Sequence, residues 1–418
     1  MWHGFADMAL VKDAPPFVVA RGEGAYLYDD TGRRYLDASA GLWFCNVGHG
    51  RQEIADAAQR QLATLAAYST FGVYTNAPAE ELAERLSQLT PTSGAAVFFS
   101  SGGSDSNDTM IKLVRRYWRV MGQPERRVIV SRSYSYHGGH MGSTGIGGIA
   151  LDYEGFGELI DDTARIPWDS SEALQRLIDE MGRDRIAAFI LEPIIAAGGV
   201  RFPPDGYLER IAKICRDNDI ILVADEVVTG FGRSGDWFAS SRFGLEPDIV
   251  VCAKGLTSGY VPLGALIVGD RVSAPFYDGR AGAFNHGYTY SGHPGGAAVA
   301  LANLAILERE QLPAHVRDIE TRMPELLRPL SEHPLVHEVR TGPAFMAAVE
   351  FEPSMVHDNP FVPSAVAAAM REVGVLTRSL VEGQIQFSPP LVAGDEQVRE
   401  FVDAALQAFA VVEGRIQA

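Results

Sequence analysis

The chain has 418 residues, of which 46% are hydrophobic and 21% charged, a composition typical of globular proteins with room for two or three domains. Acidic residues outnumber basic ones by 53 to 36, and the net charge of −17 argues against nucleic acid or an anionic membrane as a partner. We expect neither a signal peptide nor a membrane span. The three separated cysteines, Cys45, Cys215 and Cys252, predict packing roles in a reducing cytoplasm rather than disulfides or a metal site.

The first 90 residues predict short strands followed by two helices. Residues 17–37 alternate in strand-like pieces around a turn at 29–32. Over 50–65, apolar residues recur at the spacing of one helix face. A second helix is expected over 78–89, because Pro78 lies near its start, where the missing N–H costs little.

From residue 96 onward, the pattern predicts strands that alternate with helices. Helices are expected at 104–120 and 205–218. The apolar runs that predict strands fall at 96–100, 127–131, 186–191, 220–224, 248–252 and 263–268. This alternation is typical of an α/β fold, in which helices cover a mostly parallel central sheet.

After about residue 312 the pattern changes and predicts a smaller α+β domain. Strands are expected at 332–351 and 384–387, and helices at 363–374 and 394–412. We therefore expect three parts, which are an N-terminal segment that joins the small domain, 1–48, a large domain, 49–312, and the C-terminal small domain, 313–418.

Two apolar runs end in residues of opposite charge. One run ends at Asp225, and another ends just before Lys254, which precedes a glycine-rich stretch. Burial lowers the pKa of a lysine and makes its amine a nucleophile toward carbonyls and pyridoxal phosphate. Pyridoxal phosphate needs a lysine for its aldehyde and a carboxylate for its pyridine nitrogen. A single lysine after a strand is usually only a solvated strand end, so the prediction depends on the combination.

A glycine-rich loop and two flanking side chains extend this predicted site. The loop 97–106 runs from a strand into a helix, where free N–H groups and the helix dipole attract a phosphate, and Ser104 adds a hydroxyl. Tyr136 can stack on one face of a pyridine ring, and Val227, two residues past Asp225, can close the other. Taken alone, the loop could be a plain helix cap, and Tyr136 a surface tyrosine.

With these pieces in order, the chain resembles the class III aminotransferases, which are pyridoxal phosphate enzymes of fold type I, and within them the ω-transaminases. The resemblance covers nearly the whole chain and implies an α/β large domain with a smaller α+β domain. The motifs that carry it lie at 41–48, 103–109, 136–138, 192–193, 225–233, 253–256, 286–294 and 388–391.

The resemblance implies a role for each site residue. Lys254 would form the internal aldimine and shuttle the proton, Asp225 would keep the pyridine nitrogen protonated, and Tyr136 would complete the catalytic set. Thr289 would reach the phosphate of the neighbouring subunit in a homodimer. The expected cofactor-binding residues are Gly103, Ser104, Tyr136, His137, Glu192, Asp225, Val227, Lys254 and Thr289, and the expected substrate-binding residues are Trp43, Phe71 and Arg378.

Arg378 lies close to where ω-transaminases carry a mobile arginine that binds the carboxylate of an acidic substrate. The spacing is one residue longer than usual through 381–383, and the alternative is a solvated arginine in a loop. Three other positions depart from the family pattern. Gly102 replaces a common serine, Asp105 a common glutamate, and Ile195 a common glutamine, which would make the pocket more apolar.

The function implied is ping-pong transfer of an amino group from a primary amine or ω-amino acid to a keto acid, with pyruvate the expected acceptor. Alternatives that keep the fold are an aminomutase, a racemase, a decarboxylating transaminase, or a non-catalytic protein that binds pyridoxal phosphate. The intact set of Lys254, Asp225 and Tyr136 argues against the last. The sequence leaves open the physiological amine, the stereochemical preference, and whether dimers pair into tetramers.

Overall fold

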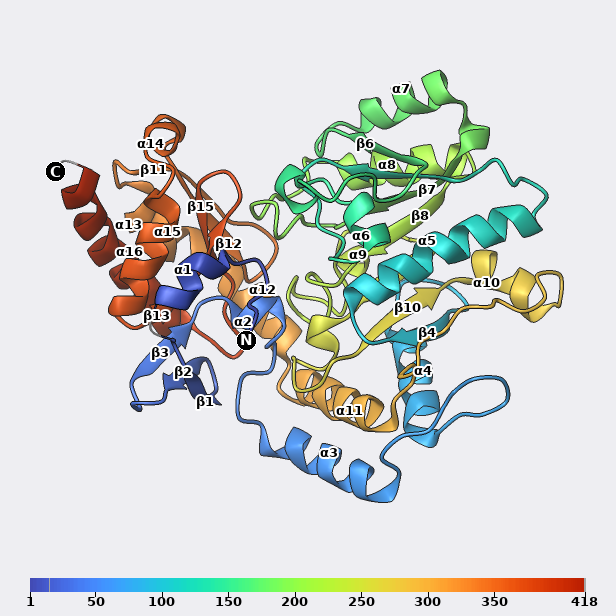
Figure 1. The fold of residues 1–418 in the computed structure, drawn as a ribbon, viewed down its shortest axis with the longest axis horizontal. Helices are drawn as coiled ribbons and strands as arrows, with labels where there is room; N and C mark the ends of the chain where they lie inside the picture. The colour runs from blue at the N-terminus through green and yellow to red at the C-terminus, as the bar shows by residue number, and fades with distance from the viewer. Residues whose placement is uncertain (15, 417–418) are drawn as a thin grey trace.

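The computed structural model describes residues 1–14 and 16–416. Figure 1 shows a large body built around a central sheet and a smaller body, in which the blue N-terminal strands lie beside the orange and red C-terminal elements. Among the described residues, none of the helices combines the length and the apolar character that a membrane span requires.

The central sheet has seven strands in the order β4-β10-β9-β8-β7-β5-β6. Its four pairings from β9 to β6 are parallel, whereas β10 runs antiparallel to both of its neighbours. The predicted mostly parallel sheet is therefore confirmed. The strands are β4 (Ala96–Ser100), β5 (Val128–Arg132), β6 (Thr163–Ile166), β7 (Ile186–Leu191), β8 (Ile221–Asp225), β9 (Ile249–Cys252) and β10 (Gly264–Val268).

Helices cover both faces of this sheet because alternate strand residues are apolar on both sides. In β8, Leu222 and Ala224 pack into one buried cluster, and Ile221 and Val223 pack into another. The helices of the large body are α3 (Gln52–Thr64), α4 (Ala77–Leu89), α5 (Gly103–Val120), α6 (Met141–Gly145), α7 (Ser171–Met181), α8 (Tyr207–Asp217), α9 (Ala239–Arg242), α10 (Asp270–Tyr277) and α11 (Pro294–Arg309).

The smaller body contains two four-stranded sheets and the C-terminal helices. Its sheet orders are β1-β2-β3-β13 and β11-β12-β15-β14. The strands are β1 (Val19–Glu23), β2 (Tyr26–Asp29), β3 (Arg34–Asp37), β11 (Val336–Arg340), β12 (Ala347–Phe351), β13 (Val375–Leu376), β14 (Ser379–Leu380) and β15 (Gln384–Phe387). The helices are α1 (Met8–Asp13), α2 (Ala40–Trp43), α12 (Leu312–Glu320), α13 (Met323–Ser331), α14 (Pro353–Asp358), α15 (Val362–Glu372) and α16 (Asp395–Ile416).

One strand pairing connects the two ends of the chain. β3 lies parallel to β13, with Leu36 opposite Val375. Because the N-terminal strands complete a sheet with a C-terminal strand, this pairing supports the division that we propose, in which 1–48 joins 313–418.

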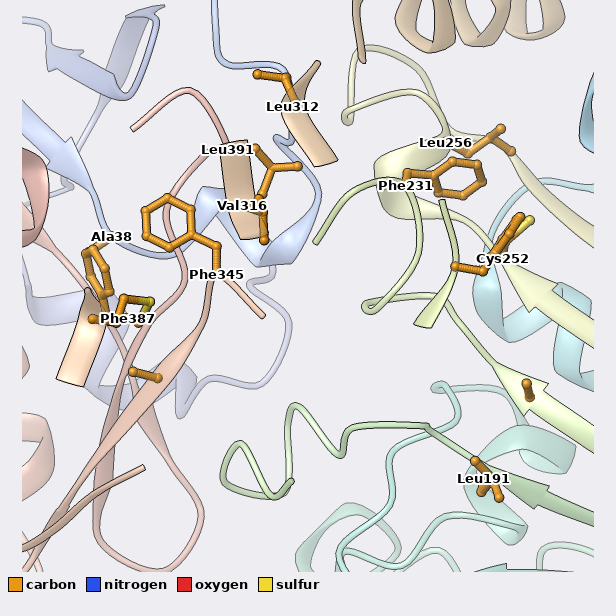
Figure 2. Close-up of a cluster of buried hydrophobic side chains, with 14 of the residues drawn as sticks. Ala38, Leu191, Phe231, Cys252, Leu256, Leu312, Val316, Phe345, Phe387 and Leu391 are labelled. Carbon is orange, nitrogen blue, oxygen red and sulfur yellow. The ribbon is translucent and has the colours of Figure 1, made fainter. Parts of the chain in front are cut away.

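An apolar cluster fills the junction between the two bodies. Figure 2 shows Phe345, Phe387 and Leu391 of the smaller body, while Phe231, Leu256 and Cys252 of the same cluster lie on the side of the central sheet. The fully buried Arg233 crosses the junction and donates to the backbone oxygens of Phe345 at 2.9 Å and Pro389 at 2.6 Å. This packing fixes the smaller body against the strand ends where β8 and β9 finish. All three cysteines are free and buried, as their predicted packing roles require.

Candidate active site

Asp225 and Lys254 lie at the ends of two neighbouring parallel strands. Asp225 closes β8 opposite Val251, and β9 ends two residues before Lys254. Parallel strands end at one edge of a sheet, so both side chains line a single pocket of about 420 Å³. Lys254 has φ +41°, a left-handed conformation that is costly outside glycine and typical of functional sites.

Three donors fix the carboxylate of Asp225, which is 3% exposed. Nδ1 of His137 lies 2.8 Å from Oδ2, Nδ2 of Asn107 donates to the same oxygen at 2.9 Å, and the amide of Val227 donates to Oδ1 at 3.1 Å. Asn107 also donates to the backbone oxygen of His137 at 2.7 Å. These contacts hold the carboxylate in one orientation, and Asp225 lines the pocket.

Burial lowers the pKa of Lys254 from 10.5 to about 8. The carboxylates of Asp225 and Glu192 act in the opposite direction, and Arg378 adds to the lowering. The Lys254 side chain is half-buried and lines the pocket, so protein groups surround much of it in place of solvent. At pH 7 a pKa of about 8 leaves roughly one amine in ten neutral, against roughly one in three thousand at the ordinary value. The amine is therefore suited to attack a carbonyl.

The glycine-rich loop meets the pocket at the first turn of α5. A Cβ on Gly103 would lie 3.0 Å from Cγ2 of Val227, so glycine allows the close approach there. Oγ of Ser104 accepts a hydrogen bond at 3.0 Å from the amide of Gly139. Asp105, one of the departures from the family pattern, still contacts the loop, because its carboxylate accepts a hydrogen bond from the amide of Ser101 at 3.0 Å. The 18-residue helix α5 thus directs its positive end at the pocket.

Tyr136 and Glu192 form another part of the wall. The Glu192 carboxylate accepts from the amides of Tyr136 at 2.9 Å and Ala196 at 3.2 Å, and burial raises its pKa. Burial also raises the pKa of the Tyr136 hydroxyl. Ile195 is fully buried and does not line the pocket, whereas Ala197 does. Ile195 therefore does not make the pocket more apolar by direct contact, although its departure from the family pattern led us to expect this.

Trp43 lies beside both Lys254 and Arg378. Nζ of Lys254 lies 5.3 Å from the centre of the Trp43 ring, and Cζ of Arg378 lies 5.0 Å from it. The indole N–H donates to Oγ of Ser388 at 3.2 Å, which fixes the ring. Burial lowers the pKa of Arg378, while Tyr136 and Asp152 act in the opposite direction. The indole can therefore form one side of a substrate space near the lysine.

Four predicted residues do not line this pocket. Trp43 and Arg378 lie next to Lys254 but outside the lining, and Phe71 and Thr289 lie elsewhere. Phe71 is exposed and lines a separate hollow of about 1420 Å³ together with His286 and Gly287. Thr289 is exposed in the same segment. The expected role of Thr289 lies in a neighbouring subunit and stays a prediction, as does the role of Phe71.

The residues of the pocket fit pyridoxal phosphate. The Lys254 amine, with its lowered pKa, suits the aldehyde of the cofactor. The buried and oriented carboxylate of Asp225 suits the pyridine nitrogen, and the start of α5, with the close approach at Gly103, suits the phosphate. The volume is in the usual range for small-molecule sites. In the described residues, His, Cys, Asp and Glu side chains form no set of three that could hold a metal ion.

Sequence reasoning missed Asn107 and Phe44. Asn107 holds Asp225, and Phe44 lines the pocket. Both lie inside motifs that carry the family resemblance, and this location was the one indication in the sequence that they belong to the site. Spacing alone does not say which polar residue of a helix faces a site.

Comparisons with known proteins agree with this geometry. The family model for class III aminotransferases matches residues 8–409. The putrescine–pyruvate aminotransferase of Pseudomonas aeruginosa is 37% identical over 425 residues, which cover 96% of this chain and 92% of that protein.

Solved structures match over nearly the whole chain. A transaminase from a marine Virgibacillus has a TM-score of 0.95 at 36% identity, with 99% of this chain and 97% of that chain covered. An ω-transaminase from Pseudomonas jessenii, solved in complex with PMP, has a TM-score of 0.93 at 35% identity, with 98% and 96% covered. The chain therefore belongs to the class III aminotransferase family, and is a pyridoxal-phosphate-dependent aminotransferase of fold type I.

Proposed function

We propose that the chain is an ω-amino acid or amine:pyruvate transaminase, which moves an amino group from a primary amine to a keto acid in two half-reactions. The observation that carries the proposal is the shared pocket of Lys254 and Asp225 at the ends of β9 and β8. The likeness to a putrescine–pyruvate aminotransferase and to ω-transaminases supports the substrate class. No feature of the pocket favours a mutase, a racemase or a silent binder.

The pocket residues divide the chemistry between them. Bound pyridoxal phosphate supplies an electron sink for the carbon that loses its proton. The amine of Lys254 would hold the cofactor's aldehyde and, once free, would carry a proton between the substrate carbon and the cofactor carbon that flank the transferred nitrogen. Asp225 would hold the pyridine nitrogen, and Tyr136 and Val227 would hold the ring.

We assign the phosphate and the substrate to different groups of residues. Gly103, Ser104 and the start of α5 are proposed to hold the phosphate, as hydroxyl and N–H donors at a positive helix end do. Next to Lys254, Trp43 would shape the substrate space, and Arg378 would bind the keto acid carboxylate as a two-pronged donor.

We also propose a homodimer in the cytoplasm. The exposed apolar residues Phe71, Val73 and Tyr74 line the large hollow beside segment 284–287, and Thr289 lies nearby in the chain. A second subunit over this face would cover apolar surface and allow Thr289 to reach its site. The three free cysteines support a reducing compartment.

The test is amine-dependent bleaching of the yellow, cofactor-loaded protein without an acceptor. β-Alanine, 4-aminobutyrate and 1-phenylethylamine are expected to bleach it at different rates, and pyruvate is expected to restore the colour with formation of alanine. A colour that no amine bleaches would favour a mutase, racemase or silent binder. A protein that takes up no pyridoxal phosphate would contradict the proposal.

A further inference from the structure

Arg378 lies at the base of a short hairpin. β14 and β15 pair antiparallel, and they are connected by the turn 381–383. The backbone oxygen of Arg378 accepts from the amide of Gln386 at 3.2 Å, and Oγ1 of Thr377 donates to the oxygen of Gln386 at 2.5 Å. The position of the Arg378 backbone therefore depends on where this hairpin lies.

The turn of the hairpin is held from within the smaller body. Glu382 and Gly383 have φ of +61° and +87°. The backbone oxygen of Gly383 accepts from the amide of Phe351 at 3.0 Å, and a Cβ on Gly383 would lie 2.9 Å from Cγ2 of Val356. This is the turn that we expect to be one residue longer than in the family pattern, and Glu382 lies within it.

Glu382 meets an arginine of the large body. Its Oε2 lies 2.7 Å from Nη2 of Arg201, whose Nε donates to the backbone oxygen of Gly198 at 2.9 Å. The guanidinium lies 4.1 Å from the centre of the Tyr134 ring, and the side chain is 14% exposed. A hydrogen bond to Glu382 is the main cause that raises the pKa of Tyr134. The arginine of the pair is thus largely buried and stacked, whereas the Glu382 side chain is 49% exposed.

The loop 195–201, which carries Arg201, also touches the hairpin and the pocket. Its backbone oxygen at Gly199 accepts from Nη2 of Arg340 at 2.8 Å. A Cβ on Gly199 would lie 2.4 Å from Oε1 of Gln384, so the loop packs directly on β15. Two residues earlier, Ala197 lines the Lys254 pocket. One loop therefore connects the pocket wall to the hairpin that carries Arg378.

We propose that the Glu382–Arg201 pair is a clamp that positions Arg378 beside Trp43 and so sets the preference for substrates with a carboxylate. The inference rests on the proposed function and adds a specificity-determining pair to it. Glu382 acts through the hairpin, since the charged and titratable groups that act on Arg378 are Tyr136 and Asp152. Without the clamp the guanidinium samples more positions and meets the keto acid less often, whereas an uncharged amine needs no such partner.

The test uses Glu382→Gln in the cofactor-loaded full chain. We expect the KM for pyruvate to rise about fivefold, as loss of one partly exposed ion pair permits, with kcat and the KM for 1-phenylethylamine unchanged. Arg201→Gln should have the same effect, and the double variant should add nothing further. Hydrogen exchange in peptides that cover 376–387 should become faster in each.

Glu325→Gln is the matched control, because it removes an ion pair of 3.0 Å to Arg328 on α13 and leaves the hairpin intact. An equal rise in both KM values, additive single variants, or faster exchange without a selective change in pyruvate KM would overturn the proposal. If the wild-type protein shows no half-reaction with any amine, the proposed function fails and the selectivity role fails with it. Unchanged exchange in the hairpin overturns the clamp itself.

Discussion

Nδ1 of His137 lies 2.8 Å from Oδ2 of Asp225, and Nε2 of the same buried ring has no hydrogen-bond partner among the described residues. In the tautomer with its proton on Nδ1, the ring donates to this carboxylate oxygen. His137 therefore acts as a donor that orients Asp225, together with Asn107 on the same oxygen.

Asp225→Asn tests the carboxylate itself. The variant keeps the size of the side chain but removes the charge that we propose opposite the pyridine nitrogen. Loss of one partner of a buried charge pair costs about 3–5 kcal/mol, so the first half-reaction should slow by more than about 100-fold. Stopped-flow bleaching with a saturating amine measures this rate. Asp236→Asn, which removes a surface ion pair to Arg317, should leave it unchanged. A rate for Asp225→Asn within a few-fold of wild type would contradict the role.

The lowered pKa of Lys254 predicts how its reaction depends on pH. The neutral amine is the nucleophile, and its fraction rises as the pH rises through about 8 and then levels off. Capture of pyridoxal phosphate by the cofactor-free protein, followed by borohydride reduction and mass spectrometry, should show this profile on the peptide that contains Lys254. The exposed Lys213 serves as an internal comparison, and Lys254→Ala should carry no label in the pocket and show no turnover. A capture rate that is still rising steeply at pH 10 would contradict the lowered pKa.

The fold could be predicted from the sequence where apolar strand patterns are long and uninterrupted. β7, β8 and β9 are fully buried, and their apolar runs are visible directly. β6 was missed because Thr163–Ile166 is short and only Ile166 is buried, so its run has no clear pattern. Predicted strands of the central sheet were displaced by at most one residue, as at β5, which begins at Val128 rather than at 127. Helix ends were displaced further, as at α16, which ends at Ile416 rather than at 412.

The candidate site could be predicted only in part. Asp225 and Lys254 followed from strand ends, because parallel strands bring such residues to one edge. Trp43 and Arg378 were predicted from the family resemblance alone, because the contact of Arg378 with the Trp43 ring joins segments far apart in the chain. Asn107 was missed because its partner is reached only through the packing of α5 against the sheet.

Gly102 offers a test of the departure from the family pattern at the glycine-rich loop. Its φ is 175°, an extended conformation open to any residue, and an added Cβ meets no atom within 4 Å. Gly102→Ser should therefore fold normally and tighten pyridoxal phosphate binding by about five- to tenfold, the effect of one added hydrogen bond. Equilibrium titration of the cofactor-free protein measures it. The neighbouring Gly103→Ala should weaken binding, because its Cβ would crowd Val227 at 3.0 Å. Equal affinities for the two variants would contradict a phosphate site at this turn.

Arg378→Ala tests the substrate side of the pocket. An arginine fork on a carboxylate forms charge-assisted bonds worth about 1.5–3 kcal/mol, so the KM for pyruvate should rise about 10- to 100-fold. The KM for 1-phenylethylamine should stay the same or fall, because removal of the guanidinium leaves more apolar space beside Trp43. Arg371→Ala, which removes an arginine of α15 that lies 5.6 Å from the Phe17 ring centre, is the control for general loss of charge. Steady-state kinetics with both substrates separates the outcomes. An equal rise in the two KM values would show that Arg378 supports the fold of the hairpin and does not select the carboxylate.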